Sequence, residues 1–252
     1  MTPGVEIHFD RVSKWFAGKT SDAEAFRAVD GLSLDIAQGE MVALLGKTGC
    51  GKSTTFNLIA GLMEPSAGTV RVQGLDPFRN FNDLRGKIAV VFQNDRLLPW
   101  RTAIGNVELG LEMLSRPAPE RREVAQFWLS RLGLAGHEHD YPHALSGGMR
   151  QRVSIARAFA TDASILLCDE PFSSLDEITA QRLREEFASL VRENGKTAVF
   201  ITHSINEALQ IGNRVIVMTR PARVAYDVRL GPDVKPGQDG AIRSRIQEVL
   251  AA

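Results

Sequence analysis

The sequence predicts an α/β fold with a mainly parallel sheet, and three observations lead to that prediction. Short apolar stretches of strand length alternate with helical patterns in the first and last thirds of the chain. A Gly-rich turn joins the apolar run Met41–Leu45 to a helical pattern that starts at Lys52. Between about residues 102 and 160 no β-branched run stands out, and helical spacing dominates. Because alternating strands and helices favour parallel pairing, the helical stretch is expected as a subdomain inserted into an α/β core.

The expected strands are apolar runs bounded by polar or Gly-containing segments. In chain order they cover residues 5–9, 26–36, 41–45, 69–73, 88–92, 165–168, 198–202 and 214–218. The polar segment 18–24, between the first two strands, is expected to be a loop.

The expected helices are stretches in which apolar residues recur at helical spacing. The first four cover residues 52–60, one helix on each side of the break at 117–119, and residues 149–159. Three more are expected after them: residues 177–193, a helix between the last two strands, and a short final helix with Ile242, Ile246, Val249 and Leu250. The Gly- and Pro-rich stretch 231–240 is expected to be a linker.

Composition and charge argue against several classes of protein. The 252 residues carry 30 basic and 30 acidic side chains, so the chain lacks the basic footprint of a nucleic-acid binder. No apolar run approaches the roughly 20 residues that span a bilayer. The first ten residues contain neither a basic leader nor an apolar core, and two cysteines do not make a disulfide framework. We therefore expect a reduced cytosolic protein with no nucleic-acid partner.

Residues 46–53 (GKTGCGKS), here called the phosphate loop, fit the pattern G-x-x-x-x-G-K-S. Glycines let backbone N–H groups turn toward phosphates without side-chain clashes, and the following helix offers its positive N-terminal end. Lys52 is expected to neutralise the β- and γ-phosphates of a nucleotide, and the Ser53 hydroxyl to bind Mg²⁺. Lys47 is either a further phosphate contact or a solvated side chain. The candidate ATP-binding residues of this segment are Gly46, Lys47, Thr48, Gly49, Cys50, Gly51, Lys52, Ser53 and Thr54.

The apolar strand 165–168 ends in the carboxylates Asp169 and Glu170, followed by Pro171. Such a strand is the expected partner of a phosphate loop. Asp169 is expected to hold Mg²⁺ through water, and Glu170 to orient and polarise the attacking water. Neighbouring strand residues point to opposite faces, so these separate roles require the strand to end here, and Pro171 indicates that it does.

Ser146, Gly147 and Gly148 stand before a helical stretch, between the phosphate loop and the strand with two acids. A Ser-Gly-Gly helix start is by itself a common N-cap. The order and spacing of the three motifs nevertheless resemble the ATP-binding cassette (ABC) family, whose signature reads LSGGQ. The resemblance implies that these three residues bind the γ-phosphate of ATP held by a second copy. Two departures, Met149 and Ala144, replace a glutamine that is common at each position, and neither touches the phosphate-binding atoms.

Further residues match the family pattern in order and spacing. Gln93 corresponds to the glutamine that senses Mg²⁺ and the γ-phosphate, and His203 to the switch histidine that contacts the γ-phosphate. Phe16 stands where the family places an aromatic ring against adenine, with Trp15 as a second candidate. Residues 174–176 (SLD) match the D-loop, which crosses the dimer interface. The resemblance thus implies catalytic roles for Glu170, His203 and Gln93, and Mg²⁺ contacts for Ser53, Gln93 and Asp169.

The resemblance also implies a P-loop NTPase (RecA-like) core with an N-terminal antiparallel β-subdomain and an inserted α-helical subdomain at about residues 95–162. One ABC ATPase domain would cover residues 1–230, and 231–252 would form a short C-terminal tail. The implied activity is hydrolysis of ATP to ADP and phosphate by a head-to-tail dimer with ATP between its subunits. The implied partners are integral membrane permease subunits and, indirectly, an extracytoplasmic solute-binding protein, with the chain at the cytoplasmic face of the inner membrane.

Two short segments, 94–100 (NDRLLPW) and 219–224 (TRPARV), resemble the nitrate, sulfonate and taurine importer class. The first is expected to dock a cytoplasmic helix of a membrane subunit, with internal packing as the alternative. We therefore expect an ATPase that powers import of a small solute of that class. An ABC ATPase of another importer class and a soluble ABC ATPase without a transport role are the alternatives within the family. A metabolic phosphotransferase with the same phosphate loop is a third reading.

Overall fold

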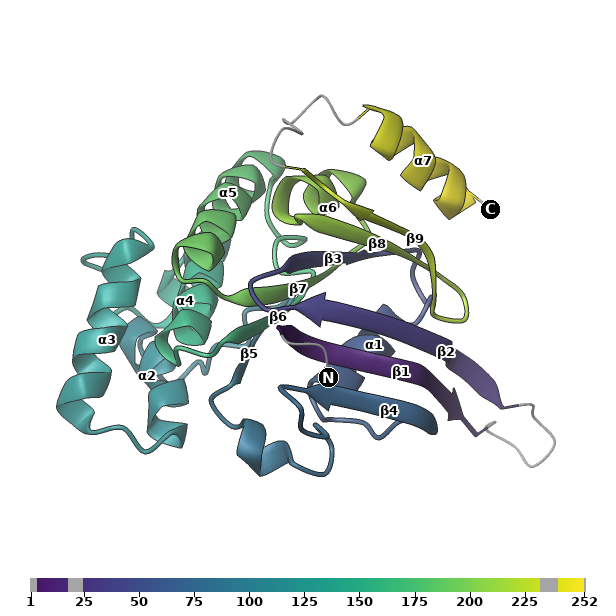
Figure 1. Ribbon diagram of the computed structural model, residues 1–252. Coiled ribbons are helices and arrows are strands. Elements are labelled where there is room, and N and C mark those ends of the chain that lie inside the picture. The colour runs from purple at the N-terminus through teal and green to yellow at the C-terminus, as the bar shows by residue number, and fades with distance from the viewer. Residues whose placement is uncertain (1–3, 18–24, 232–239, 252) are drawn as a thin grey trace. The chain divides into compact units, whose positions relative to one another are not determined.

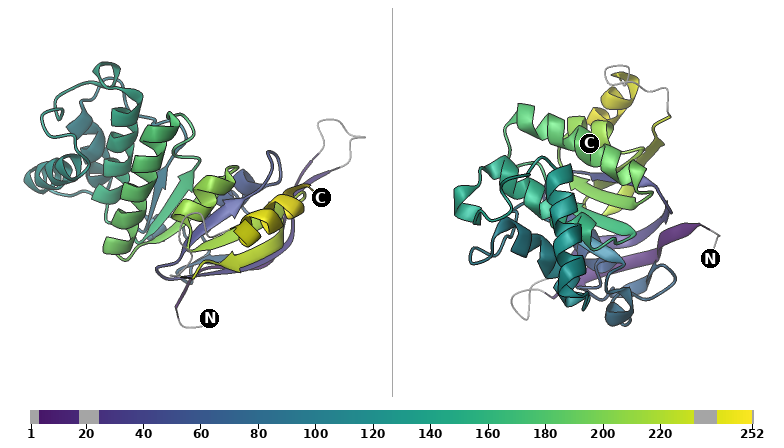
Figure 2. Two further views of the ribbon diagram at one scale, coloured as in Figure 1. Left: turned by 90° about the horizontal axis from the view of Figure 1, so that it is seen from above. Right: turned by 90° about the vertical axis from the view of Figure 1, so that its left-hand side faces the viewer.

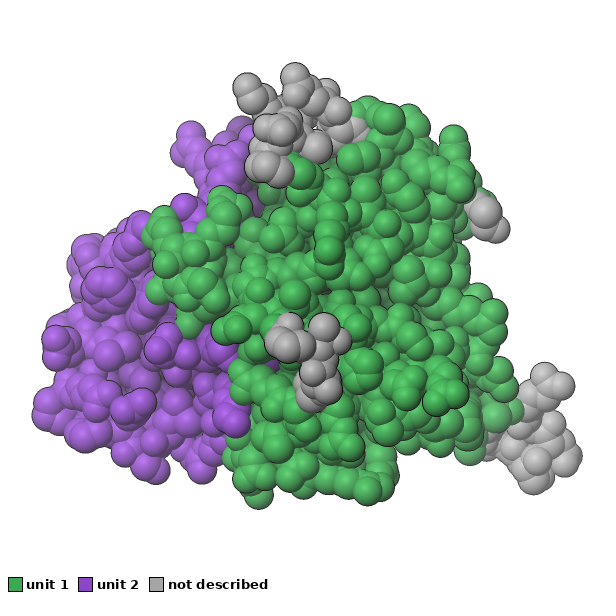
Figure 3. All heavy atoms as spheres, viewed as in Figure 1, with its two compact units in different colours: residues 1–84, 190–252 green, residues 85–189 purple. Residues whose placement is uncertain are grey.

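The structure is a computed structural model that describes residues 4–17, 25–231 and 240–251. It divides the chain into two compact units, coloured separately in Figure 3. Unit 1 comprises residues 1–84 and 190–252, and unit 2 comprises residues 85–189. The expected loop 18–24 and residues 232–239 of the expected linker lie outside the described residues.

A three-stranded antiparallel sheet forms the N-terminal part of unit 1, with strand order β2-β1-β4 (Figure 1). Its strands are β1 (Val5–Phe16), β2 (Phe26–Ala37) and β4 (Ala67–Val72). β1 continues past the expected end at Phe9, because a bulge with Arg11 at a φ of 47° carries the strand across a break in its alternation. The expected N-terminal antiparallel β-subdomain is confirmed.

The second sheet segment of unit 1 surrounds β3 (Met41–Leu45). β3 pairs in parallel with β7 (Thr197–Thr202) and with β8 (Arg214–Thr219), and β9 (Arg223–Arg229) pairs antiparallel with β8. All five residues of β3 are buried, as expected for a parallel strand with neighbours on both sides. β9 was not predicted, because its residues are largely exposed and lack the continuous apolar run of the central strands.

Among the described residues, three α-helices lie wholly in unit 1: α1 (Lys52–Ile59), α6 (Ile205–Ile211) and α7 (Gly240–Ala251). Helix α7 lies beside β8 and β9 in Figures 1 and 2. Its Ile246 is fully buried in an apolar cluster with Ala43 and Leu45 of β3 and Val215 and Val217 of β8. Burial of this face explains why the final helix forms after a Gly- and Pro-rich stretch.

A buried arginine in β8 connects this strand to β2 and β9 of unit 1. Arg214 of β8 donates hydrogen bonds to Asp227 of β9 at 2.6 Å, to Glu40 at 3.1 Å and to the carbonyl oxygen of Asp35 in β2 at 2.7 Å. The hydrogen bonds to Asp227, followed by the negative charge of Glu40, raise the pKa of Arg214. Each buried charge in this group therefore has a partner, as a stable interior requires.

Unit 2 contains a parallel pair of strands and a helical bundle. β5 (Ile88–Val91) pairs with β6 (Ile165–Asp169), and α5 (Glu177–Glu193) begins in this unit. Helices α2 (Ala103–Met113), α3 (Ala118–Arg131) and α4 (Gly147–Ala160) form the teal bundle seen in both views of Figure 2. The boundaries 95–162 of the expected inserted subdomain stay a prediction.

Aromatic contacts pack the interior of unit 2. The Phe159 ring lies 4.9 Å from Trp128 and 5.5 Å from Phe187, and Phe187 lies 5.9 Å from Phe172, measured between ring centroids. Tilted and edge-on pairs of this kind stabilise a core beyond their buried area. Two short 3₁₀ helices, Phe81–Leu84 in unit 1 and Pro142–Ala144 in unit 2, complete the elements. In the part of the chain that the structure describes, no helix has the length and apolar character to cross a membrane.

Candidate functional site

The phosphate loop leaves the carboxyl end of β3 and leads directly into α1. Gly51, the N-cap of α1, has a φ of 103° and supplies no side-chain cap. A Cβ atom on Gly51 would lie 2.4 Å from the carbonyl oxygen of Ala28, and one on Gly46 would lie 2.7 Å from that of Met218. Both positions therefore require glycine, and the first N–H groups of α1 are left without a side-chain cap that would compete with an anion.

Lys52 points its ammonium group into the loop. Its side chain is 6% exposed, and Nζ donates hydrogen bonds to the carbonyl oxygens of Gly46 at 2.7 Å and Lys47 at 3.1 Å. Cys50 is 2% exposed, with Sγ 4.0 Å from that nitrogen. The loop thus surrounds one fixed positive charge, as binding of a polyphosphate requires. The remaining candidates of the loop are accessible, with Lys47, Thr48, Gly49 and Ser53 exposed and Thr54 partly buried.

His203 lies beside the phosphate loop because their supporting strands are paired. Leu45 of β3 is in register with Thr202 of β7, so Gly46 and His203 follow paired residues at the same end of two parallel strands. His203 is exposed. Ligands of α/β proteins bind at this carboxyl edge of the sheet, so unit 1 brings His203 and the loop to one place.

Trp15 and Phe16 lie at the end of β1. Trp15 pairs with Arg27 and Phe16 with Phe26 in β2, next to Ala28, whose carbonyl group approaches Gly51. Trp15 is 42% exposed and Phe16 38% exposed, which leaves both rings accessible to a flat ligand. The Nζ atom of Lys14 lies 5.6 Å from the Phe16 ring centroid, so Phe16 already makes a cation–π contact.

In unit 2 the paired strands β5 and β6 bring three candidates to one edge. Val91 is in register with Cys168, so Gln93 and Asp169 both follow shortly after paired residues. Glu170 has a φ of 46°, a conformation that ends the strand and is uncommon for a residue with a side chain. Ser173 donates hydrogen bonds to the Glu170 carbonyl from its N–H at 3.2 Å and its Oγ at 3.0 Å, which holds this turn. Strain of this kind is typical of functional sites.

The signature loop, defined as residues 145–148, opens helix α4. Ser146 is the N-cap, and its Oγ accepts a hydrogen bond from the N–H of Met149 at 3.3 Å. A Cβ atom on Gly148 would lie 3.2 Å from Thr179 Cγ2, whereas one on Gly147 would meet only the tip of the flexible Arg150 side chain. The serine and the first glycine are exposed, so this helix start is accessible from outside unit 2.

The expected D-loop, residues 174–176, ends at the start of α5. The Asp176 carboxylate accepts a hydrogen bond from the N–H of Thr179 at 3.0 Å. That bond is the main reason why the pKa of Asp176 is lowered. The aspartate is exposed and ionised, so it offers a charged helix cap at the surface.

The side chains expected to bind Mg²⁺ all offer oxygen atoms, the kind of ligand that this ion prefers. Ser53 offers a hydroxyl, Gln93 an amide and Asp169 a carboxylate, and Mg²⁺ prefers oxygen ligands with several waters retained. Over the described ranges, no group of three or more His, Cys, Asp or Glu side chains is arranged to hold a metal ion by itself.

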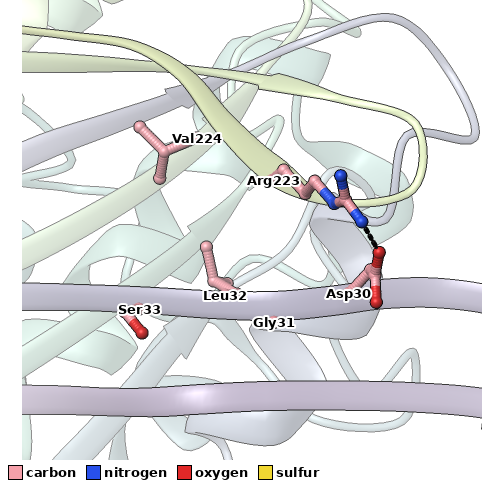
Figure 4. A pocket seen from close by; sticks show the side chains of 6 residues that line it. All are labelled: Asp30, Gly31, Leu32, Ser33, Arg223 and Val224. Atoms are coloured by element: carbon pink, nitrogen blue, oxygen red, sulfur yellow. Dashed lines mark hydrogen bonds and ion pairs between the residues drawn. The ribbon is translucent and has the colours of Figure 1, made fainter.

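A cavity of about 440 Å³ lies elsewhere in unit 1, between β2 and β9 (Figure 4). It is lined by Asp30, Gly31, Leu32, Ser33, Arg223 and Val224, and an ion pair joins Arg223 to Asp30. No residue expected to bind ATP or Mg²⁺ is among this lining. The cavity therefore does not correspond to the nucleotide site.

Sequence reasoning missed the residues that hold the segment after Gln93. Asn106 is fully buried and hydrogen-bonded to Leu98, and Arg150 is paired with Asp95. Asn106 resembles any polar helix residue in the sequence, and the two charges of the ion pair lie 55 positions apart. No local pattern signals either contact.

Known proteins resemble this chain over most of its length. A profile described as ABC transporter matches residues 29–173. The taurine import ATP-binding protein TauB of Yersinia pestis is 43% identical over 203 residues, which cover 81% of this chain and 78% of that protein. The nitrate import ATP-binding protein NrtC of Synechococcus elongatus is 42% identical over 194 residues, 76% of this chain and 29% of that protein.

Solved structures give the same result for the fold. The dimeric post-hydrolysis state of the ATP-binding cassette MJ0796 with ADP and phosphate has a TM-score of 0.77 and 34% identity, and the match covers 89% of this chain and 99% of that chain. The cbiO1 protein of Clostridium perfringens, part of a transporter complex, has a TM-score of 0.81 at 24% identity, covering 97% of this chain and 93% of that chain. The expected P-loop NTPase fold is confirmed.

Proposed function

The chain belongs to the ABC transporter family as an ATP-binding subunit with ATPase activity, and we propose that it powers import of a small solute of the nitrate, sulfonate and taurine type. The observation that carries the import role is the similarity to TauB, an import protein, over four fifths of the chain. The segment NDRLLPW supports the same class, since Trp100 is 71% exposed and available to a partner. The alternatives are an ABC ATPase of another importer class and a soluble ABC ATPase without a transport role.

ATP binding is assigned to the phosphate loop. The N–H groups of residues 46–54 surround the phosphates, and Lys52 leaves part of its contact with the loop carbonyls to neutralise them. Phe16 stacks on adenine, with Trp15 as the second candidate ring. Ser53, Gln93 and Asp169 hold Mg²⁺, which, when bound, neutralises charge that develops on the phosphate oxygens.

Hydrolysis is assigned to Glu170, His203 and Gln93. Glu170 accepts a proton from water as the water oxygen attacks the γ-phosphorus, and the bond to the bridging oxygen of ADP breaks. His203 donates a hydrogen bond to the γ-phosphate, where negative charge accumulates. Gln93 senses Mg²⁺ and the γ-phosphate and relays their presence, through the segment that follows it, to the membrane partner.

Two copies are proposed to act together. Ser146, Gly147 and Gly148 of one subunit bind the γ-phosphate of ATP in the partner subunit, head to tail, so that two ATP molecules lie in the interface. Closure on ATP and opening after hydrolysis move the permease subunits that dock near Trp100. The chain is accordingly placed at the cytoplasmic face of the inner membrane, held there by the permease, with a solute-binding protein on the other side.

The test is a mild-detergent purification of the tagged chain from its native membranes, followed by mass spectrometry. A membrane-spanning subunit in near-equal amount is expected, and its binding protein is then screened with nitrate, sulfonates and taurine. Recovery of soluble proteins alone would contradict the transport role and leave the ATPase standing.

A matched variant tests the catalytic assignment. Glu170→Gln is expected to bind ATP normally and to accumulate as a dimer. Its kcat is expected to fall about 10²- to 10⁴-fold, because the amide cannot accept the proton. Turnover near that of the unchanged protein would refute the role of Glu170.

A further inference from the structure

Arg150, on the first turn of α4, bridges two loops of unit 2. Its Nε lies 3.0 Å from Oδ2 of Asp95, and its Nη1 donates a hydrogen bond to the carbonyl oxygen of Leu145 at 2.8 Å. Leu145 directly precedes Ser146 in the signature loop, and Asp95 lies two positions after Gln93. One guanidinium group therefore connects the segment after Gln93 to the signature loop, with the fixed geometry that arginine allows.

The Asp95 carboxylate also closes the turn in which it lies. Its Oδ1 accepts a hydrogen bond from the N–H of Leu97 at 3.1 Å, while Oδ2 faces Arg150. Arg96 adopts a φ of 48°, and its guanidinium lies 3.9 Å from the centroid of the Phe92 ring. The carboxylate thus serves two contacts at once, one inside the turn and one to helix α4.

Two other residues of α4 donate hydrogen bonds to the same turn. Gln151 donates a hydrogen bond to the Phe92 carbonyl at 3.4 Å, and Arg157 donates to the Asp95 carbonyl at 2.7 Å and to the Arg96 carbonyl at 2.9 Å. These bonds reach backbone atoms and do not depend on the Asp95 side chain. The turn therefore stays attached to α4 when the carboxylate is altered, and only its link to the start of the helix is lost.

The docking loop, defined as residues 97–101, is held on its other side by Asn106. This side chain has no exposed surface; its Oδ1 accepts from the N–H of Leu98 at 2.7 Å, and its Nδ2 donates to the carbonyl oxygens of Arg101 and Thr102 at 3.0 Å each. A buried amide with its partners satisfied fixes the local backbone. Trp100 is therefore displayed on a rigid loop.

We propose that Asp95 and Arg150 are positioning residues that align the turn after Gln93, and with it the docking loop, to the signature loop. The inference rests on the proposed function, since it assumes that Gln93 and Ser146 act on ATP. When the signature loop meets ATP of the partner, the Arg150 bridge sets the Gln93 segment in its productive position. Coupling of this kind needs contiguous contacts between rigid parts, which the bonds above supply.

A second ion pair on the same helix provides a matched control. Arg152 of α4 pairs with Glu186 of α5 and donates to the Leu132 carbonyl, so it also joins a carboxylate and a backbone oxygen. The side chains of the two pairs are similarly shielded from solvent. Arg152 contacts neither the turn after Gln93 nor the signature loop in these bonds. Loss of either pair is expected to affect stability, and only loss of the Asp95 pair to affect catalysis.

The test compares Asp95→Asn, Arg150→Gln, the double variant and Glu186→Gln in the full-length chain, with Mg-ATP as the probe. In Asp95→Asn the amide oxygen keeps accepting from the Leu97 N–H, which leaves the amide NH2 donor facing Arg150, so the charge-assisted link is lost. Asp95→Asn and Arg150→Gln are each expected to lower kcat about three- to tenfold with KM for ATP within about twofold, and the double variant to fall no further than either single one. Glu186→Gln is expected to keep kcat within about twofold at a similar loss in Tm.

Hydrogen–deuterium exchange provides a readout that a stability effect would not produce. In the unchanged protein, Mg-ATP is expected to protect amides of residues 93–98 and 145–150 together; in Asp95→Asn, protection of 145–150 persists and that of 93–98 is lost.

Unchanged kcat in Asp95→Asn, additive losses in the double variant, or an equal loss in Glu186→Gln would each overturn the proposal. If Asp95→Asn does not fold, Arg150→Gln carries the same test. Absence of ATP hydrolysis in the unchanged protein would instead refute the proposed function.

Discussion

The two helix N-termini proposed to bind phosphate, at α1 and at α4, are held in shape by different contacts. At α1 the N-cap is Gly51 in the left-handed region, without a side-chain cap and with Ala28 and Ala222 packed where a Cβ would lie. At α4 the N-cap is Ser146 in an extended conformation, with its hydroxyl bonded to Met149. The first start is shaped by packing and the second by a local hydrogen bond. The first is therefore expected to tolerate substitution far less.

The largest effect is expected for Gly51→Ala. The added Cβ meets the Ala28 carbonyl at 2.4 Å in a backbone conformation that already disfavours alanine, so unfolding free energy should fall by at least about 2 kcal/mol. Nucleotide binding should be lost with it. Thermal unfolding and binding of a fluorescent ATP analogue measure both quantities.

Gly49→Ala separates backbone strain from steric clash. Gly49 has a φ of 79°, yet a Cβ there would meet no atom within 4 Å. The expected loss of stability is about 1 kcal/mol, from the left-handed conformation alone. A loss equal to that of Gly51→Ala would show that packing against Ala28 does not distinguish the two positions.

A smaller effect on stability is expected for Ser146→Ala at the second start. Loss of the cap should cost about 1 kcal/mol, while ATP-driven dimer formation should be abolished because the γ-phosphate contact is lost. Thr102→Ala is the matched control, since Thr102 caps α2 through a hydrogen bond from Gly105 and has no proposed contact with ATP. Light scattering with Mg-ATP measures the dimer. Equal dimer formation in the two variants would contradict the role of Ser146.

The smallest effect is expected from pH at a third helix start, that of α5. The hydrogen bond from Thr179 lowers the pKa of Asp176, so the carboxylate stabilises the folded state above the unfolded pKa of about 4. That contribution is lost as pH falls through the lower folded pKa. Asp176→Asn keeps an acceptor and should flatten this part of the profile of unfolding free energy against pH. A profile that does not change would remove Asp176 from the acid-sensitive groups.

Elements with strong local signals were predicted well. β3 and α5 occupy the expected residues, because one is a continuous apolar run between turns and the other a long amphipathic helix. Chain order and spacing were sufficient to identify the family, since the phosphate loop, the signature loop and the strand with two acids each have a composition that their chemistry requires. The residue roles stay predictions until the variants are measured.

Features that depend on contacts between distant residues were not predicted. The bulge at Arg11 extends β1 beyond its alternating pattern, and β9 forms by pairing with β8 despite its exposed residues. The Asp95–Arg150 bridge joins charges from two elements that the sequence treats separately. In each case the stabilising partner is too far away in the sequence for local periodicity to reveal it.

The pairing of β3 has a consequence for synthesis on the ribosome. The strand that carries the phosphate loop ends at Leu45, but its hydrogen-bonded neighbours are β7 and β8, which begin at Thr197 and Arg214. At typical translation rates those neighbours are made roughly 8 to 30 seconds later, about 150 residues further along the chain. During that interval β3 lacks both of the strands that pair with it in the folded structure. The phosphate loop is therefore expected to reach its folded position only after the chain has been made through β8.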